Sequence, residues 1–121
     1  MSKELFQNFN HVDDPDWIIK VYFNHLYSCG RFMQGVSLFI EKTGYSINYD
    51  GCAFPDLSDF DPFYHFDGVK LWCGNDEIII SDAKFVDFIK QACKLFLSEH
   101  PEDEEKLKEI LNRGKEYQIK I

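Results

Sequence analysis

The stretch DGVKLWCGNDEIIISDAKFVDFIKQACKLFLSEHPEDEEKLKEIL, residues 67–111, decides the fold, because its hydrophobic pattern changes from strand-like to helical within one continuous run. Its first part places apolar and β-branched residues on both sides of the turn Gly-Asn-Asp at 74–76. Such residues favour strands, and a short turn of this composition joins antiparallel neighbours. The sequence therefore predicts a β-hairpin with arms 64–73 and 77–81, unless the first arm breaks into two pieces at Asp67-Gly68.

Two helices follow the hairpin in the same stretch. Ser81 is a good N-cap residue, and apolar residues then recur every three or four positions, which predicts a helix to about Ser98. Pro101 separates this helix from a charged one at 102–113, where Glu and Lys residues four positions apart support each other. The alternating tail 117–121 is typical of a short edge strand.

The chain before this stretch begins with helical patterns. Asp14-Pro15 has the composition of a helix start, and helical spacing of apolar residues continues as far as Gly30. A second helix is predicted from about Arg31 to Lys42, and the alternation at 45–49 predicts a strand. The segment from Asp50 to about Pro62 shows neither period, so we expect it to be irregular.

These elements combine into an α+β domain. The predicted order is ααβββαα(β), with an antiparallel sheet of about three to four strands packed by about four helices. A length of 121 residues fits a single domain spanning 1–121, and a hydrophobic content of 45% is enough for one core.

The balance of charges limits the classes of partner. The chain contains 21 acidic and 13 basic residues, which gives a net charge of −8. This excess repels phosphate groups, so it argues against nucleic acid and against an anionic membrane surface as partners. Two interpretations of the charge stay open, namely solubility alone and electrostatic matching to a basic partner.

The cysteines and the N-terminal segment indicate a reducing compartment. The four cysteines stand singly, without a CxxC pair, which is unlike a zinc site. The first 14 residues contain no apolar segment of the secretory type, and no apolar run is long enough to span a membrane. We therefore expect a cytoplasmic protein with free thiols.

The sequence carries no recognisable catalytic motif. It contains no GxSxG, no Gly-rich phosphate loop and no HExxH. The pair Asp59/Asp61 lacks neighbours that would separate the pKa values of the two carboxyl groups for acid–base chemistry. We expect no catalytic residue, no cofactor and no metal site. A small hydrolase that uses this pair or His65 is the remaining enzymatic alternative.

The stretch DGCAFPDLSDFDPFYHFDG, residues 50–68, interleaves five aspartates with aromatic residues and contains no Lys or Arg. It does not fit a calcium loop, because no register supplies oxygen ligands at the spacing of an EF-hand. In one interpretation, its aromatic residues fold onto the core while its aspartates cap turns. In the other, the stretch is a binding loop, which is the usual reason for a long segment without secondary structure.

The second half of the chain resembles the CdiI-type immunity proteins, which are the partners of ribonuclease toxins in contact-dependent growth inhibition. The matching motifs are G-V-x-L at 68–71, D-E-I-I-I-S at 76–81, F-x-x-x-I-x-x-A-C at 85–93 and H-P-E-D at 100–103. The resemblance implies a cytoplasmic, non-enzymatic inhibitor. Such a protein binds its cognate toxin domain, one to one, so that RNA cannot enter.

The resemblance and the charge lead to one functional prediction. A ribonuclease needs a basic cleft to attract phosphate, and carboxylates of an inhibitor are steered into such a cleft. An acidic adaptor for another basic partner is the alternative, and binding at an exosite is an alternative within the immunity role. From charge and expected exposure, the predicted toxin-binding residues are Asp56, Asp59, Asp61, Phe63 and Tyr64, with Asp76 and Glu77 at the hairpin tip as a second patch.

Overall fold

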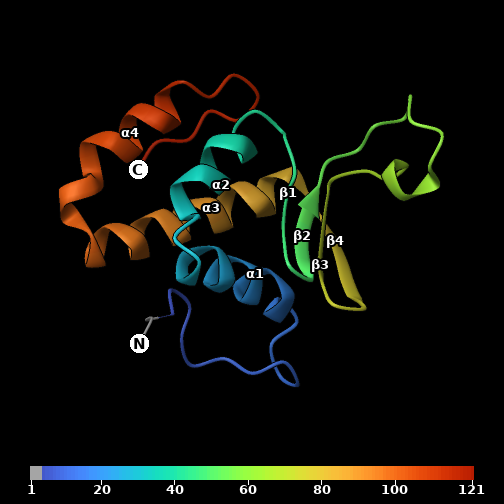
Figure 1. Cartoon of the computed structure of the whole chain (residues 1–121), viewed down its shortest axis with the longest axis horizontal. Helices are drawn as coiled ribbons and strands as arrows, with labels where there is room; N and C mark the ends of the chain where they lie inside the picture. The colour runs from blue at the N-terminus through green and yellow to red at the C-terminus, as the bar shows by residue number, and fades with distance from the viewer. Residues whose placement is uncertain (1–3) are drawn as a thin grey trace.

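The computed structural model describes residues 4–121. Residues 1–3 lie outside the described part; they begin the N-terminal segment of 14 residues in which no secretory signal is predicted. The helices gather on one side of the strands (Figure 1). None of the helices in residues 4–121 is long and apolar enough to cross a membrane. The helices are α1 (Trp17–Ser28), α2 (Phe32–Phe39), α3 (Asp82–Glu99) and α4 (Glu104–Asn112). The strands are β1 (Tyr45–Ile47), β2 (Asp50–Ala53), β3 (Val69–Cys73) and β4 (Asp76–Ile80), and short 3-10 turns lie at η1 (Pro62–Tyr64) and η2 (Pro101–Asp103).

The strands form one antiparallel sheet in the order β1-β2-β3-β4, so the predicted α+β class is confirmed. The predicted hairpin is confirmed as well, because β3 and β4 pair from Val69↔Ile80 to Cys73↔Asp76. Its first arm is shorter than the predicted 64–73, because β3 starts only after Gly68 and residues 64–68 form no strand. Gly68 has a φ of +100°, and a Cβ there would lie 2.2 Å from the Ile80 carbonyl oxygen, so the position requires glycine.

The sheet buries one face against the helices. Side chains alternate along a strand, so Val69 and Leu71 of β3 point to the same face as their neighbour Cys52 of β2, and all three are buried. The largest buried side chains nearby are four aromatic rings with centroid separations of 5.3–6.2 Å. This group, called the aromatic core below, consists of Tyr22, Phe23, Phe39 and Phe85.

The strand β2 was not predicted, and the expectation of an irregular segment was wrong for residues 50–53. Its sequence, DGCA, begins with two residue types that are rare in strands. Contacts from elsewhere in the fold hold both of them. The buried Asp50 forms an ion pair with His25 of α1, and Gly51 leaves room for Trp72, because a Cβ at residue 51 would lie 2.3 Å from the indole ring.

The C-terminal tail also differs from the prediction. Residues 117–121 form no strand in the described part of the chain, so the element order is ααββββαα. Instead, the backbone N–H of Tyr117 donates to the Ile40 carbonyl oxygen at 3.0 Å, and the side chains of Tyr117 and Ile119 are buried. The alternation in the tail therefore reflects packing beside the helices rather than pairing with the sheet.

Candidate functional site

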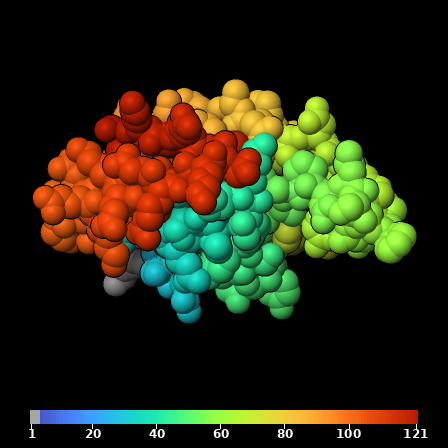
Figure 2. All heavy atoms as spheres, turned by 90° about the horizontal axis from the view of Figure 1, so that it is seen from above, coloured from blue at the N-terminus to red at the C-terminus, as the bar shows by residue number. Residues whose placement is uncertain are grey.

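The segment between β2 and β3, residues 54–68, is called the acidic loop here. It leaves the sheet at the end where β2 stops and β3 starts, and it projects away from the helices (Figure 1). Figure 2 shows it as a lobe at one end of the molecule. A large partner can therefore reach the loop without displacing any helix.

Three aspartates fix the shape of the acidic loop by accepting backbone hydrogen bonds. The Asp56 carboxylate accepts from the N–H of Ser58 at 3.1 Å, and the Asp59 carboxylate accepts from the N–H of Asp61 at 2.8 Å. The Asp61 carboxylate accepts from the N–H of Phe63 at 3.0 Å and starts the turn η1. All three side chains remain exposed. The aspartates thus cap turns and still present their charge to solvent.

Local hydrogen bonds also favour the ionised form of Asp56. The hydroxyl of Ser58 donates to this carboxylate at 2.6 Å, in addition to the backbone N–H. These bonds, the hydroxyl first, lower the pKa of Asp56 from its usual value. The carboxylate is therefore charged at any physiological pH.

Lys70 anchors the base of the acidic loop on the outer face of the sheet. Its side chain is buried, its ammonium donates to the Phe63 carbonyl oxygen at 2.7 Å, and the same ammonium lies 3.9 Å from the centre of the Phe63 ring. That ring packs against Trp72 at 5.5 Å and Tyr64 at 5.0 Å. The predicted contact residues Phe63 and Tyr64 are therefore half-buried, and part of their surface is used within the protein.

Two apolar side chains that the sequence prediction did not select are the most exposed apolar residues of the loop. Leu57 is 76% exposed and Phe60 is 100% exposed. When a partner covers a ring that is fully exposed to solvent, the free energy of the complex is lowered. The sequence did contain a signal, since Phe60 stands between Asp59 and Asp61 and a ring flanked by two charges does not easily enter a core.

A groove of about 600 Å³ lies beside the acidic loop. Asp56, Asp59 and Tyr64 line it from the loop, and Ser46 of β1 and Trp72 of β3 line it from the sheet. The structure thus brings three of the predicted contact residues around one hollow.

Asp76 and Glu77 do not belong to this group. Both are exposed beside the turn between β3 and β4, at the end of the sheet opposite the acidic loop. The five residues of β3 separate the two ends by about 17 Å. The two predicted patches are therefore distinct surfaces, and one partner contacts both only if it spans the sheet.

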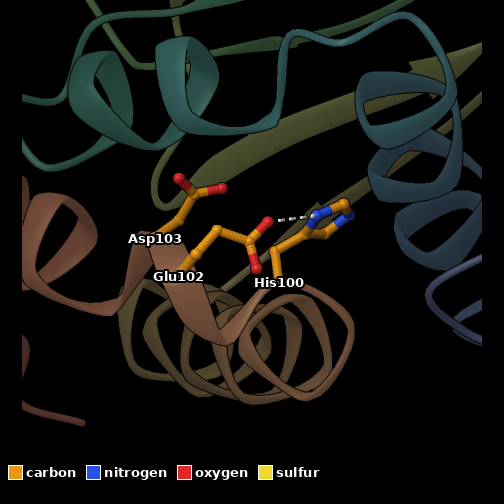
Figure 3. A group of neighbouring side chains, drawn as sticks. All are labelled: His100, Glu102 and Asp103. Carbon is orange, nitrogen blue, oxygen red and sulfur yellow. Dashed lines mark ion pairs between the residues drawn. The ribbon is translucent and has the colours of Figure 1, made fainter.

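One group of side chains in residues 4–121 has donor atoms close enough to hold a metal ion. His100, Glu102 and Asp103, between α3 and α4, each place one such atom within 4.8 Å of the others. Figure 3 shows the Glu102 carboxylate directed toward the His100 ring, with 3.4 Å between Oε2 and Nδ1. The Tyr27 hydroxyl lies 2.7 Å from Nε2 of the same ring. These contacts join α1 to the junction, and the carboxylates lie at the start of a helical segment, which favours negative charge.

A thiol lies near the His25–Asp50 ion pair. Burial, followed by the hydrogen bond and charge of Asp50, raises the pKa of the Cys73 thiol to about 11. The thiol is therefore protonated at neutral pH, whereas a nucleophilic cysteine needs a lowered pKa. All four cysteines are free in the structure.

Comparison with known proteins decides the family. The sequence profile of CDI immunity proteins matches residues 15–111, from the start of α1 almost to the end of α4. This chain belongs to that family. The match confirms the resemblance seen in the second half of the sequence and extends it to the N-terminal helices. A CDI immunity protein has a toxin as its partner. Binding that partner must use surfaces of the fold that are exposed to solvent.

A solved structure shares the fold of this CDI immunity protein. The crystal structure of the immunity protein NMB0503 from Neisseria meningitidis MC58 aligns with a TM-score of 0.72 at 19% sequence identity. The alignment covers 91% of this chain and 97% of that chain. No match was found among curated proteins.

Proposed function

We propose that this CDI immunity protein binds the ribonuclease domain of its cognate toxin, one to one, and covers the basic cleft through which RNA enters. The acidic loop is the part that faces the cleft. One observation carries the proposal: a single projecting segment combines exposed carboxylates, held by backbone hydrogen bonds, with the fully exposed ring of Phe60.

The charge of the acidic loop suits a ribonuclease. Such an enzyme must attract phosphate, so positive side chains surround its cleft. Residues 54–68 contain four aspartates, at positions 56, 59, 61 and 67, and no Lys or Arg. Opposite charges accelerate association, and the acceleration is largest at low salt. The loop would therefore be guided to the cleft before close contacts form.

Apolar contacts would then hold the complex together. Phe60 and Leu57 are the large exposed apolar side chains of the loop. Covering one such side chain completely contributes about 1.5–3 kcal/mol to the free energy of binding. Clefts that bind RNA stack bases on aromatic rings, so a ring of the inhibitor can take the place of a base. Phe60 is accordingly the residue that we expect to act as the main anchor.

A stable complex needs only a small part of the surface of this chain. A standard interface buries about 800 Å² on each partner, roughly one ninth of the 7345 Å² of this chain. We expect the acidic loop and the adjoining edge of the sheet to supply this area. Asp76 and Glu77 join the interface only when the toxin extends along the sheet.

The proposal places the protein in the cytoplasm, where an incoming toxin would meet RNA. Co-expression with the toxin domain encoded in the neighbouring gene tests it. We expect growth to be restored, the two chains to co-purify in equal amounts, and cleavage of total RNA to stop in a purified mixture. Continued cleavage at saturating immunity protein would contradict the proposal. An inactive toxin variant that binds RNA and immunity protein together would place the contact at an exosite.

A further inference from the structure

We infer that the groove beside the acidic loop binds a guanidinium group, the side chain of an arginine on the toxin. The inference rests on the proposed function and specifies one contact within it. It is carried by the walls of the groove, which two aspartates and two aromatic residues line together: Asp56, Asp59, Tyr64 and Trp72.

The shape of the groove suits a side chain that enters from a partner. Its volume of about 600 Å³ admits an arginine together with part of the backbone that carries it. Its aromatic wall is fixed, because the indole of Trp72 passes so close to Gly51 that a Cβ there would lie 2.3 Å from the ring. Phe63 packs against the same indole at 5.5 Å. A planar group can therefore stack there without first ordering the ring.

The groove keeps a negative charge although it has two basic neighbours, Lys42 and His65. The His65 ring interacts with Asp56 through charge, and its Nε2 lies 2.6 Å from the Asp59 carbonyl oxygen. Lys42 lines the groove, but its ammonium lies 3.7 Å from the Asp82 carboxylate and 5.5 Å from the centre of the Tyr117 ring. Within residues 4–121, Asp56 and Asp59 form no ion pair with a Lys or Arg side chain. A cationic side chain of the toxin would supply the opposite charge.

A guanidinium group matches these walls better than other cations do. It is planar, stacks on aromatic rings, and donates several hydrogen bonds in a fixed fork to carboxylates. An ammonium group acts as a point charge and gains less from a flat aromatic wall. A phosphate group would be repelled by both aspartates.

A titration with a small probe tests the groove without the toxin. N-acetyl-arginine amide is added to the full ¹⁵N-labelled chain, and the indole N–H signals of Trp72 and Trp17 are followed by NMR. Trp17 lies on α1 and does not line the groove, so it serves as the internal reference. We expect the Trp72 signal to shift and saturate in the millimolar range, while Trp17 stays in place. N-acetyl-citrulline amide, which has nearly the same shape without the charge, should leave both signals unchanged. Equal effects of the two probes, or no effect, would overturn the inference.

Two variants of the loop test whether position or total charge matters. Asp59→Asn removes one charge from the groove and keeps an oxygen that can accept from the N–H of Asp61. Asp67→Asn removes the same charge from the same loop outside the groove. We expect the first to weaken arginine binding at least about fivefold and the second less than about twofold. Equal weakening would show that the probe senses net charge, and the inference would be wrong.

The same two variants separate this inference from the proposed function. If the wild-type protein binds the toxin and Asp59→Asn weakens the complex more than Asp67→Asn, both statements are supported. If the toxin binds and the two variants weaken it equally, the groove inference is wrong and the immunity function stands. If the toxin does not bind the wild-type chain, the proposed function and the arginine contact are both wrong, and the probe titration shows whether the groove recognises guanidinium at all.

Discussion

The aromatic core and the acidic loop use the same residue type in opposite ways. Phe85 in the core packs against Phe39 at 5.3 Å and is inaccessible to solvent, whereas Phe60 in the loop is 100% exposed. Phe85 belongs to the apolar face of α3, while Phe60 has an aspartate on each side that accepts a hydrogen bond from the loop backbone. In this protein, packing of aromatic rings stabilises the fold, whereas another ring stands exposed to solvent between two carboxylates that hold the loop backbone.

The largest expected effect is on stability, and it differs between the aromatic core and the acidic loop. Phe85→Ala should lower the free energy of unfolding by about 3–5 kcal/mol, because it removes a fully buried ring. Phe60→Ala should change it by about 0.5 kcal/mol or less, because nothing in the fold depends on that ring. Urea denaturation of both variants measures the difference. Similar losses for the two would remove the distinction between core and loop.

The second prediction concerns the affinity for the toxin, to which the loop residue Phe60 should contribute although it contributes little to stability. Phe60→Ala should weaken toxin binding by about 2 kcal/mol, or about 30-fold, because an anchor ring is lost. Tyr49→Ala is the matched control, since Tyr49 is 82% exposed in the turn between β1 and β2, at the far end of the sheet. Calorimetric titration with an inactive toxin domain measures both. An equal loss for Tyr49→Ala would move the interface away from the loop.

The third prediction concerns carboxylates, which the two regions also use differently. His25→Ala should lower the free energy of unfolding by about 1–3 kcal/mol, because the buried Asp50 carboxylate loses its ion-pair partner and keeps only the hydrogen bond with Cys73. The double variant His25→Ala/Asp50→Asn should recover part of this loss, because no buried charge remains. His65→Ala in the exposed loop is the control; it loses only the solvent-exposed hydrogen bond of its ring with the Asp59 carbonyl oxygen and should cost about 0.5 kcal/mol or less. If the two histidine variants behave alike in chemical denaturation, the ion pair contributes nothing to the core.

The smallest expected effect is on the rate at which the four cysteine thiols are alkylated. With a pKa of about 11, Cys73 should react with iodoacetamide slowly at pH 7, and its rate should rise about tenfold for each pH unit up to pH 10. Cys29 is exposed and should be alkylated first, whereas the buried Cys52 and Cys93 should react only on unfolding. Mass spectrometry of timed samples identifies the sites. A Cys73 rate that levels off near pH 8 would contradict the raised pKa.

Much of the fold was predictable because its elements carry strong local signals. The isoleucines of β4 specify a strand, and Ser81 caps α3 as expected, since its hydroxyl accepts from the N–H of Lys84 at 3.1 Å. The strand β2 was not predictable, because Asp50 and Gly51 are accommodated by His25 and Trp72 from other parts of the chain. No local pattern contains that information.

The acidic loop was predictable in its chemistry but not in its arrangement. The charge of Asp56, Asp59 and Asp61 follows directly from the sequence. The division of the aromatic residues into a base around Phe63 and a tip at Phe60 does not, because it depends on the buried Lys70 of β3. The sequence places that lysine on a strand without showing that the loop folds over it.

The proposed function requires that the charge of the acidic loop, rather than the charge of the whole chain, directs binding to the toxin. We would compare the triple variant Asp56→Asn/Asp59→Asn/Asp61→Asn with a control that changes the net charge equally, Glu105→Gln/Glu109→Gln/Glu116→Gln, at exposed positions in and after α4. The measurement is the association rate constant for the toxin domain at low and high salt. We predict that the loop variant lowers the low-salt rate at least about tenfold and flattens its salt dependence, while the control lowers it less than about threefold. Equal slowing by the two variants would contradict the central claim.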